Sequence, residues 1–181
     1  MGKHNTPPAA RHFVAETRER RGGKLRMTGK PLRLICVGKL KQSFIQEGVS
    51  FYQKRLKPWR KLEVVEVRDG EGDIMTRKDK EAILLKKALH PKDLPIVLDM
   101  GGKHMTSEDL ALMLKTYDAT AYNSLSFVLG GPYGLAADII KAAQEIISLS
   151  HLTFTHEMAR LILCEQLYRA TCILQHIPYH H

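Results

Sequence analysis

The chain has 181 residues, of which 44% are hydrophobic and 26% are charged. Both values are typical of a soluble globular protein with one core, and no apolar run approaches the length that crosses a bilayer. We therefore expect a cytoplasmic protein without a membrane partner. The cysteines Cys36, Cys164 and Cys172 are odd in number and form no CxxC pair. This pattern favours reduced packing thiols over a disulfide or zinc framework.

Positive charge is unevenly distributed along the chain. The net charge is +9, and residues 1–31 contribute +6 of it, with eight basic and two acidic side chains. The remaining 150 residues carry 20 basic and 17 acidic side chains, a net of +3. A basic balance points to a polyanionic partner. The one cluster in the body that stands out fits either a solvated helix end or a nucleic-acid patch; it consists of Lys54, Arg55, Lys57, Arg60 and Lys61.

The first 31 residues lack apolar periodicity and contain Pro, Gly, Arg and Thr. We expect residues 1–31 to form a basic, disordered N-terminal extension and residues 32–181 to form the folded domain. The extension has no apolar stretch of the kind found in secretory signals. An organelle transit peptide is not favoured, because Glu16 and Glu19 are acidic and serine is scarce.

From residue 32 the sequence alternates between strand and helix patterns. In chain order we predict a strand at 32–38, a helix at 43–56, a strand at 62–67, a helix at 76–89, a strand at 95–102, a helix at 106–117, a strand at 124–131, a helix at 136–146, a strand or extended loop at 147–154, and a helix at 156–175. At least two of these strands are continuously apolar. The alternation indicates an α/β fold, with a parallel sheet covered by helices.

Three loops that follow strands are rich in Gly, Ser or Thr: DMGG at 99–102, LGGPYG at 129–134 and SLSHLTF at 148–154. Ligands of parallel sheets bind at such loops, beyond the carboxyl ends of the strands. Gly130, Gly131 and Gly134 let a backbone turn tightly and a ligand approach closely. Each loop alone also fits a plain turn or a helix cap. Neither a Walker loop nor GxGxxG is present, which disfavours a dinucleotide-binding dehydrogenase.

Five motifs occur in a specific order: LRLICVGK, LDMGGKHMTSE, FVLGGPYG, SLSHLTFTHEMARLILCEQLYRA and a terminal PYH. Together they resemble the family of ribosomal RNA large-subunit methyltransferase H, small enzymes of the SPOUT class. The resemblance runs from about residue 32 to residue 180. It implies a parallel-sheet SPOUT methyltransferase fold whose C-terminal part forms a deep trefoil knot, a rare exception to the rule that chains do not knot. Thr155 departs from the pattern, because the family often has proline there.

The resemblance also implies a cofactor, a partner and a substrate. The cofactor is S-adenosylmethionine, and the residues that match the family's cofactor site are Leu98, Gly130, Leu149, Ser150, His151, Leu152, Thr153 and Phe154. The family works as a homodimer in which the partner subunit completes each active site. It methylates the N3 nitrogen of a pseudouridine in 23S rRNA of the large ribosomal subunit, so DNA is not an expected partner.

Three residues are candidates for the chemistry that this activity requires. The acceptor nitrogen is a poor nucleophile until its proton leaves, so a base or an anion-stabilising group is needed. His180 suits the base because histidine titrates near neutral pH. Arg160 can hold a phosphate or a developing negative charge, and Tyr179 can stack on the target base or hydrogen-bond to it. His156 is an alternative that equally fits a structural role at a helix N-terminus.

Two other interpretations stay open on residue type alone. His176, His180 and His181 could together hold a metal, but methyl transfer from S-adenosylmethionine needs none, and we expect none. A non-catalytic ribosome-binding or RNA-binding protein that retains the fold would associate with RNA without binding the cofactor. The intact glycine, serine and PYH motifs favour the enzyme.

Overall fold

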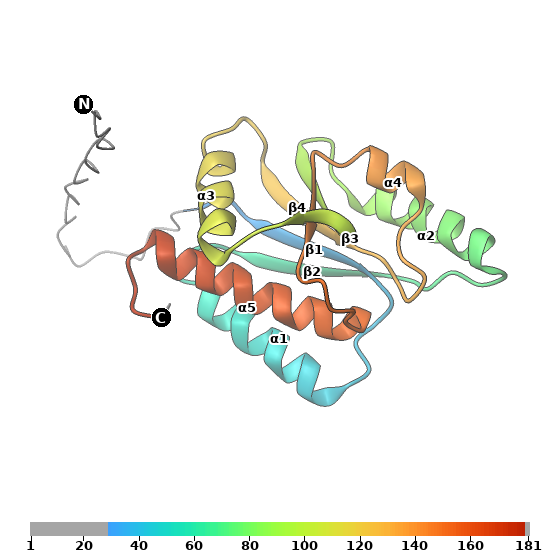
Figure 1. The fold of residues 1–181 in the computed structure, drawn as a ribbon, viewed down its shortest axis with the longest axis horizontal. Helices are drawn as coiled ribbons and strands as arrows, with labels where there is room; N and C mark the ends of the chain where they lie inside the picture. The colour runs from blue at the N-terminus through green and yellow to red at the C-terminus, as the bar shows by residue number, and fades with distance from the viewer. Residues whose placement is uncertain (1–28, 180–181) are drawn as a thin grey trace, which may run out of the picture.

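The computed structural model describes residues 29–179, which form a five-stranded sheet with helices on both faces (Figure 1). The strands are β1 (Leu32–Val37), β2 (Leu62–Val67), β3 (Asp93–His104), β4 (Ser124–Leu129) and β5 (Glu145–Ser148). The helices are α1 (Ser43–Leu56), α2 (Ile74–Ala88), α3 (Ser107–Asp118), α4 (Ala137–Lys141) and α5 (His156–Leu174). The strand order is β2-β1-β4-β3-β5, and all neighbouring strands are parallel. The predicted parallel α/β fold is confirmed.

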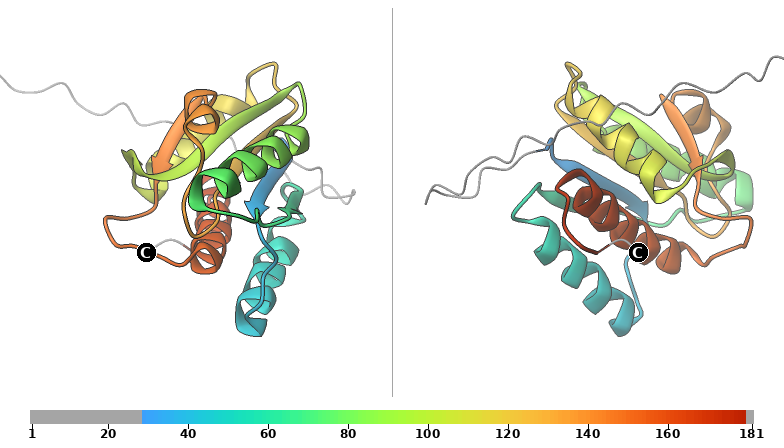
Figure 2. Two further views of the ribbon diagram at one scale, coloured as in Figure 1. Left: turned by 90° about the vertical axis from the view of Figure 1, so that its right-hand side faces the viewer. Right: turned by 60° about the vertical axis from the view of Figure 1, so that its left-hand side comes forward.

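The central strands β1 and β4 are buried along their whole length. Their continuous apolar runs follow from the helices that cover both faces of the sheet. Leu34 and Phe127 pack into the core beneath α1, α3 and α5. Ile35 and Val128, which are the next residues along these strands, pack into the core beneath α2 and α4. Figure 2 shows the two helical layers on opposite sides of the sheet.

Helix α5 begins at the carboxyl ends of the strands and runs back along the sheet (Figure 1). Its N-cap is Thr155, whose hydroxyl accepts a hydrogen bond from the backbone N–H of Met158 at 3.2 Å. The residue that replaces the family's usual proline therefore caps the helix. The Glu157 carboxylate accepts hydrogen bonds from the backbone N–H groups of Lys41 and Gln42 at 3.0 and 3.1 Å. These bonds join the start of α5 to the loop before α1.

The predicted helix at 136–146 is wrong in its second half. Helix α4 ends at Lys141, and Glu145 already belongs to β5. Strand β5 pairs with β3 through Ile96 and Glu145, and the Glu145 carboxylate accepts a hydrogen bond from the Tyr117 hydroxyl at 2.7 Å. Pairing with an existing sheet edge thus overrides the local helical pattern. The predicted extended segment at 147–154 is a strand only to Ser148 and a loop beyond it.

The three cysteines are buried free thiols, as predicted, and burial raises the pKa of Cys36 and Cys164 to about 12. Over residues 29–179, no helix is long and apolar enough to span a membrane. Most of the predicted N-terminal extension, residues 1–28, lies outside the described part of the chain. The division into an extension and a domain stays a prediction.

Candidate functional site

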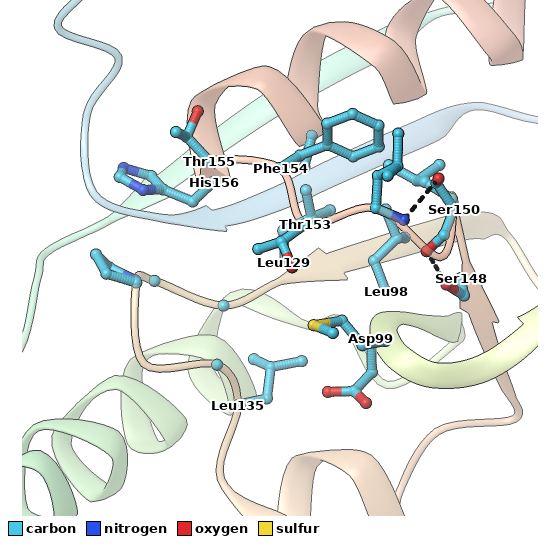
Figure 3. Close-up of a pocket in the computed structure, with 18 residues that line it drawn as sticks. Leu98, Asp99, Leu129, Leu135, Ser148, Ser150, Thr153, Phe154, Thr155 and His156 are labelled. Atoms are coloured by element: carbon cyan, nitrogen blue, oxygen red, sulfur yellow. Dashed lines mark hydrogen bonds between the residues drawn. The ribbon is translucent and has the colours of Figure 1, made fainter.

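A cavity of about 750 Å³ lies at the carboxyl ends of β4 and β5 and beside the middle of β3 (Figure 3). The middle of β3, where its pairing with β5 is interrupted, contributes Leu98, Asp99 and Met100. The end of β4 and the loop after it contribute Leu129, Gly130, Gly131, Pro132, Gly134 and Leu135. The segment from the end of β5 to α5 contributes Ser148, Leu149, Ser150, Leu152, Thr153, Phe154 and Thr155, and α5 itself contributes His156 and Ala159. Two of the three predicted loops, the one after β4 and the one before α5, therefore meet at one cavity. The third predicted loop, DMGG, lies within β3 as a bulge and contributes Asp99 and Met100.

The structure brings together all of the predicted cofactor residues except His151. Leu98 comes from β3 and Gly130 from the loop after β4, while the others lie in the loop before α5. The side chain of His151 is exposed and stacks on His104, with ring centroids 3.7 Å apart. His151 therefore lies at the rim, where its ring fixes the loop against the end of β3.

The glycine loop is shaped by its own backbone. Gly131 to Gly134 form a turn in which the Gly134 N–H donates to the Gly131 carbonyl at 3.0 Å, and Gly134 has a φ of +75°. A Cβ added to Gly130 would lie 2.7 Å from the Gly134 carbonyl carbon. No side chain fits at this contact without a backbone shift. Gly130 thus keeps the wall of the cavity thin where a ligand would approach the backbone.

The serines of the loop before α5 use their hydroxyls on the loop itself. The Ser148 hydroxyl donates to the Ser150 carbonyl at 3.1 Å, and the Ser150 hydroxyl accepts from the Leu152 N–H at 2.9 Å (Figure 3). These bonds hold a tight loop whose Leu152 side chain is 72% exposed at the cavity. An apolar side chain held in water beside a cavity is suited to cover an apolar part of a ligand.

Two titratable residues of the cavity, Asp99 and His156, were not among the predicted cofactor residues. The Asp99 carboxylate accepts a hydrogen bond from the Gly101 N–H at 2.9 Å, which shapes the bulge in β3. Burial, together with the nearby charge of Arg160, lowers the pKa of His156. His156 is therefore neutral near pH 7. Asp99 is the first residue of the predicted DMGG segment, and His156 is the first residue of the predicted helix at 156–175. Their position along the chain was therefore the available signal.

Arg160 lies in the interior and not on the cavity surface. Its side chain is 1% exposed, and its guanidinium pairs with the Glu66 carboxylate at 3.2 Å and donates to the Val37 carbonyl. These partners stand at the ends of β2 and β1, so Arg160 ties α5 to two strands. The predicted contact with a phosphate or a developing charge has no support from this position, because both partners are internal.

Tyr179 also lies away from the cavity of its own chain. His176 has a φ of +53°, and the Ile177 N–H donates to the Cys172 carbonyl at 2.9 Å, which turns the chain back at the end of α5. The Tyr179 ring then packs edge-on against Tyr168, with centroids 4.8 Å apart. Its hydroxyl donates to the Glu165 carboxylate at 3.3 Å. Burial raises the pKa of Tyr179, so this hydroxyl stays protonated.

The distance along α5 separates Tyr179 from the cavity. Glu165 lies nine residues after the cavity residue His156, which is a rise of about 14 Å along a helix. His180 and His181 lie outside the described residues. Over residues 29–179, no group of three or more His, Cys, Asp or Glu side chains is placed to hold a metal ion.

The basic cluster of residues 54–61 is not one uniform surface. Arg60 is buried and pairs with the Asp118 carboxylate at 2.8 Å. The Arg55 guanidinium lies 4.7 Å from the centroid of the Tyr168 ring. These two cations therefore have internal partners, which favours the reading as a helix end over a nucleic-acid patch.

Comparison with known proteins matches residues 31–180 to the family model described as Predicted SPOUT methyltransferase. The chain is 44% identical over 157 residues to a ribosomal RNA large subunit methyltransferase H of Desulfovibrio desulfuricans, which covers 86% of this chain and 100% of that protein. It is 43% identical over 155 residues to a protein of the same name from Nitratidesulfovibrio vulgaris, covering 84% of this chain and 99% of that protein.

A solved structure shares the fold at low sequence identity. It is described as a probable methylase family protein from Haemophilus influenzae Rd KW20, with a TM-score of 0.52 and 11% identity. The superposition covers 83% of this chain and 70% of that chain. At this identity the likeness extends to the fold alone.

Proposed function

Because the chain belongs to the SPOUT methyltransferase family, we propose that its cavity binds S-adenosylmethionine and that the protein methylates large-subunit ribosomal RNA. The acceptor is the N3 nitrogen of a pseudouridine in 23S rRNA, and the substrate is the assembled large subunit or ribosome in the cytoplasm. The observation that carries this proposal is the convergence of Leu98, Gly130 and the loop before α5 on one cavity.

The residues present fit this cofactor. The cavity volume of about 750 Å³ lies within the range of about 300–1,000 Å³ that holds small ligands. Leu98, Leu149 and Leu152 supply apolar walls for a flat ring. The glycine loop brings backbone close to a ligand at Gly130. Bound S-adenosylmethionine supplies an already activated methyl group, so the protein has to position it and prepare the acceptor.

The acceptor must lose a proton, and His180 is the group we assign to accept it. We name residues 175–181, which follow α5, the C-terminal arm. Tyr179 anchors this arm, because its ring packs against Tyr168 and its hydroxyl donates to Glu165. Glu165 itself pairs with Arg169, four residues further along α5, at 2.6 Å. Tyr179, the residue before His180 in the chain, is thus held against α5, and Arg160 acts as a positioning residue for the start of α5.

We further propose that the C-terminal arm works in the cavity of a partner subunit. The C-terminal arm follows the last residue of α5, whereas the cavity lies at the first turn of α5 (Figure 1). The arm and the cavity of one chain therefore do not meet. A homodimer with antiparallel or crossed α5 helices brings them together. Strands β4 and β5 follow one another in the chain but lie on opposite sides of β3 in the sheet, so the connection between them crosses β3. Such a crossing is compatible with the proposed trefoil knot.

Subunit mixing tests the shared site. One variant lacks residues 180–181 and keeps its cavity, and the other carries Gly130→Val and keeps its arm. Each alone is expected to be inactive. Random mixing makes about half of the dimers mixed, each with one intact site, so about a quarter of wild-type activity is expected to return. A mixture as inactive as its components would show that arm and cavity act within one chain.

The activity itself is tested by transfer of a tritiated methyl group to ribosomes that lack this modification, followed by mapping of the nucleoside. We expect N3-methylated pseudouridine, with more transfer to ribosomes than to naked 23S rRNA, since the body of the chain nets only +3. RNA association without cofactor binding or transfer would instead identify a non-catalytic RNA-binding protein.

A further inference from the structure

Tyr133 occupies an exposed position at the mouth of the cavity. It is the third residue of the turn Gly131 to Gly134, with Pro132 in the second position, where its fixed φ favours a turn. The other three residues of this turn line the cavity, whereas Tyr133 does not. Its side chain is 48% exposed. The turn therefore holds an aromatic ring in water beside the entrance.

A cation from α2 lies against this ring. The Arg77 guanidinium carbon is 5.7 Å from the Tyr133 ring centroid. Arg77 is itself fixed, because its Nε donates to the Gly72 carbonyl at 2.7 Å. The start of α2 is held as well, since the Asp73 carboxylate caps the N–H of Thr76 at 2.9 Å. Ring and guanidinium thus form a prepared pair that needs little ordering when a ligand binds.

The charges around the pair select the kind of ligand. Residues 68–80, which include Arg77, carry four basic and four acidic side chains and so have no net charge. A segment without net positive charge offers a phosphate group little attraction. A flat, uncharged nucleobase needs no such attraction and stacks well on tyrosine. The features favour recognition of a base over recognition of the RNA backbone.

We propose that Tyr133 stacks on a nucleobase of the RNA substrate next to the nucleotide that is methylated, with Arg77 backing the ring. This rests on the proposed function, and it adds a substrate contact to the glycine loop that also borders the cofactor. The contact belongs to RNA binding, so it contributes to the KM for ribosomes and not to the affinity for S-adenosylmethionine.

The test compares Tyr133→Ala and Tyr133→Phe with the wild type in steady-state methylation of ribosomes. Tyr133→Ala is expected to raise the KM for ribosomes about tenfold, as the loss of one base stack does, and Tyr133→Phe to leave it nearly unchanged. Tyr122→Ala is the matched control, because Tyr122 is 38% exposed and follows α3 at the other end of the sheet. The affinity for S-adenosylmethionine, measured by calorimetry, is expected to be the same in all variants.

The outcomes separate this proposal from the proposed function. Equal KM values for Tyr133→Ala, Tyr122→Ala and an active wild type would overturn the stacking and leave the methyltransferase intact. A loss of dimer in Tyr133→Ala by sedimentation would show that Tyr133 contacts a second subunit and would also overturn the stacking. A wild type that transfers no methyl group would overturn both.

Discussion

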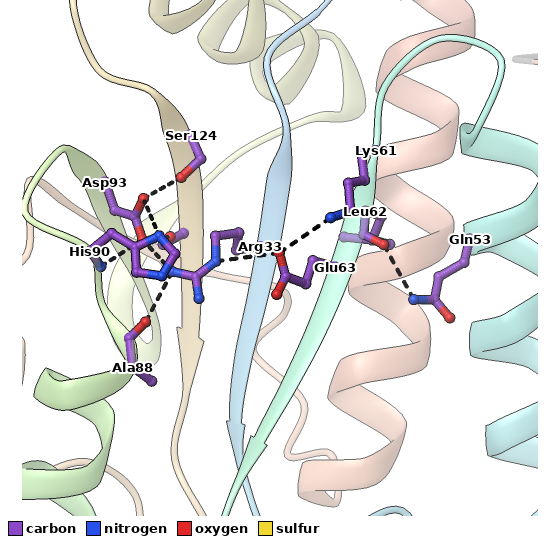
Figure 4. A network of polar contacts seen from close by, with 10 residues as sticks. Arg33, Gln53, Lys61, Leu62, Glu63, Ala88, His90, Asp93 and Ser124 are labelled. Carbon is purple, nitrogen blue, oxygen red and sulfur yellow. Dashed lines mark hydrogen bonds and ion pairs between the residues drawn. The ribbon is translucent and has the colours of Figure 1, made fainter.

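The polar side chains at the two ends of the sheet have different kinds of partner. At the carboxyl end, glycine and small polar residues border an open cavity, and their hydrogen bonds shape loops. At the amino end, buried charged side chains pair with one another (Figure 4). The fold is thus closed by charge pairs at the amino end. At the carboxyl end, Arg160 and Glu66 pair beside β1 and β2, and the cavity beside β3, β4 and β5 is open for a ligand.

The amino end is built around Asp93. Its carboxylate accepts hydrogen bonds from the Arg33 guanidinium, the Ser124 hydroxyl and the His90 backbone N–H, the last at 2.9 Å (Figure 4). The side chains of Arg33 and Asp93 are 6% and 2% exposed. A second cavity, of about 560 Å³, borders this network, but Arg33, Lys61, Glu63 and Asp93 on its wall already pair with one another. Cavity size alone therefore does not identify a site.

The largest expected effect is on stability, from Asp93→Ala. This change removes the buried counter-ion of Arg33 and leaves only the partly exposed Glu63 carboxylate, 3.8 Å from Arg33 Nε. Breaking a buried pair in this way costs about 3–5 kcal/mol. Denaturation in urea measures the loss. The matched control is Lys86→Ala, which removes the exposed pair with Asp138 and is expected to cost about 1 kcal/mol or less. Equal losses for the two variants would contradict the role given to the amino end.

The next effect is on catalysis, from His180→Ala. Removal of the assigned base is expected to lower the single-turnover rate by about 100-fold or more, while stability and cofactor affinity stay unchanged. His181→Ala, the adjacent histidine, serves as the control and is expected to be nearly as active as the wild type. Full activity in His180→Ala would show that His180 is not the base, and the base would then have to come from a residue of the cavity.

The smallest expected effect is on the pH dependence of stability, to which the amino and carboxyl ends of the sheet contribute in different pH ranges. Despite burial, hydrogen bonds from Ser124 and His90 lower the pKa of Asp93, so its contribution to stability is present above about pH 4 and is lost as the pH falls further. The pKa of His156 is also lowered, and the unfolded chain binds that proton first. Stability should therefore already decline below about pH 6.5. His156→Gln is expected to remove the decline that begins below about pH 6.5 in urea titrations, and an unchanged pH profile would contradict it.

Sequence patterns were sufficient for local features and insufficient for contacts between distant segments. The helix at 43–56 and the strand at 62–67 have the predicted bounds, because their apolar spacing and the following turns are local signals. The loops of the cavity were predicted because strand ends converge in a parallel sheet. The burial of Arg160 depends on Glu66, 94 residues away, and the start of β5 depends on β3. No local pattern encodes such partners.

The central claim is that the cavity at the carboxyl end binds S-adenosylmethionine, and titration calorimetry tests it most directly. We expect the wild type and Tyr122→Ala to bind with equal affinity, since Tyr122 lies in the loop between α3 and β4 and does not line the cavity. Gly130→Ala, which forces the glycine loop to move, and Leu152→Asp, which alters an exposed wall residue, are both expected to bind at least about tenfold more weakly. Wild-type affinity in both of these variants would contradict the claim.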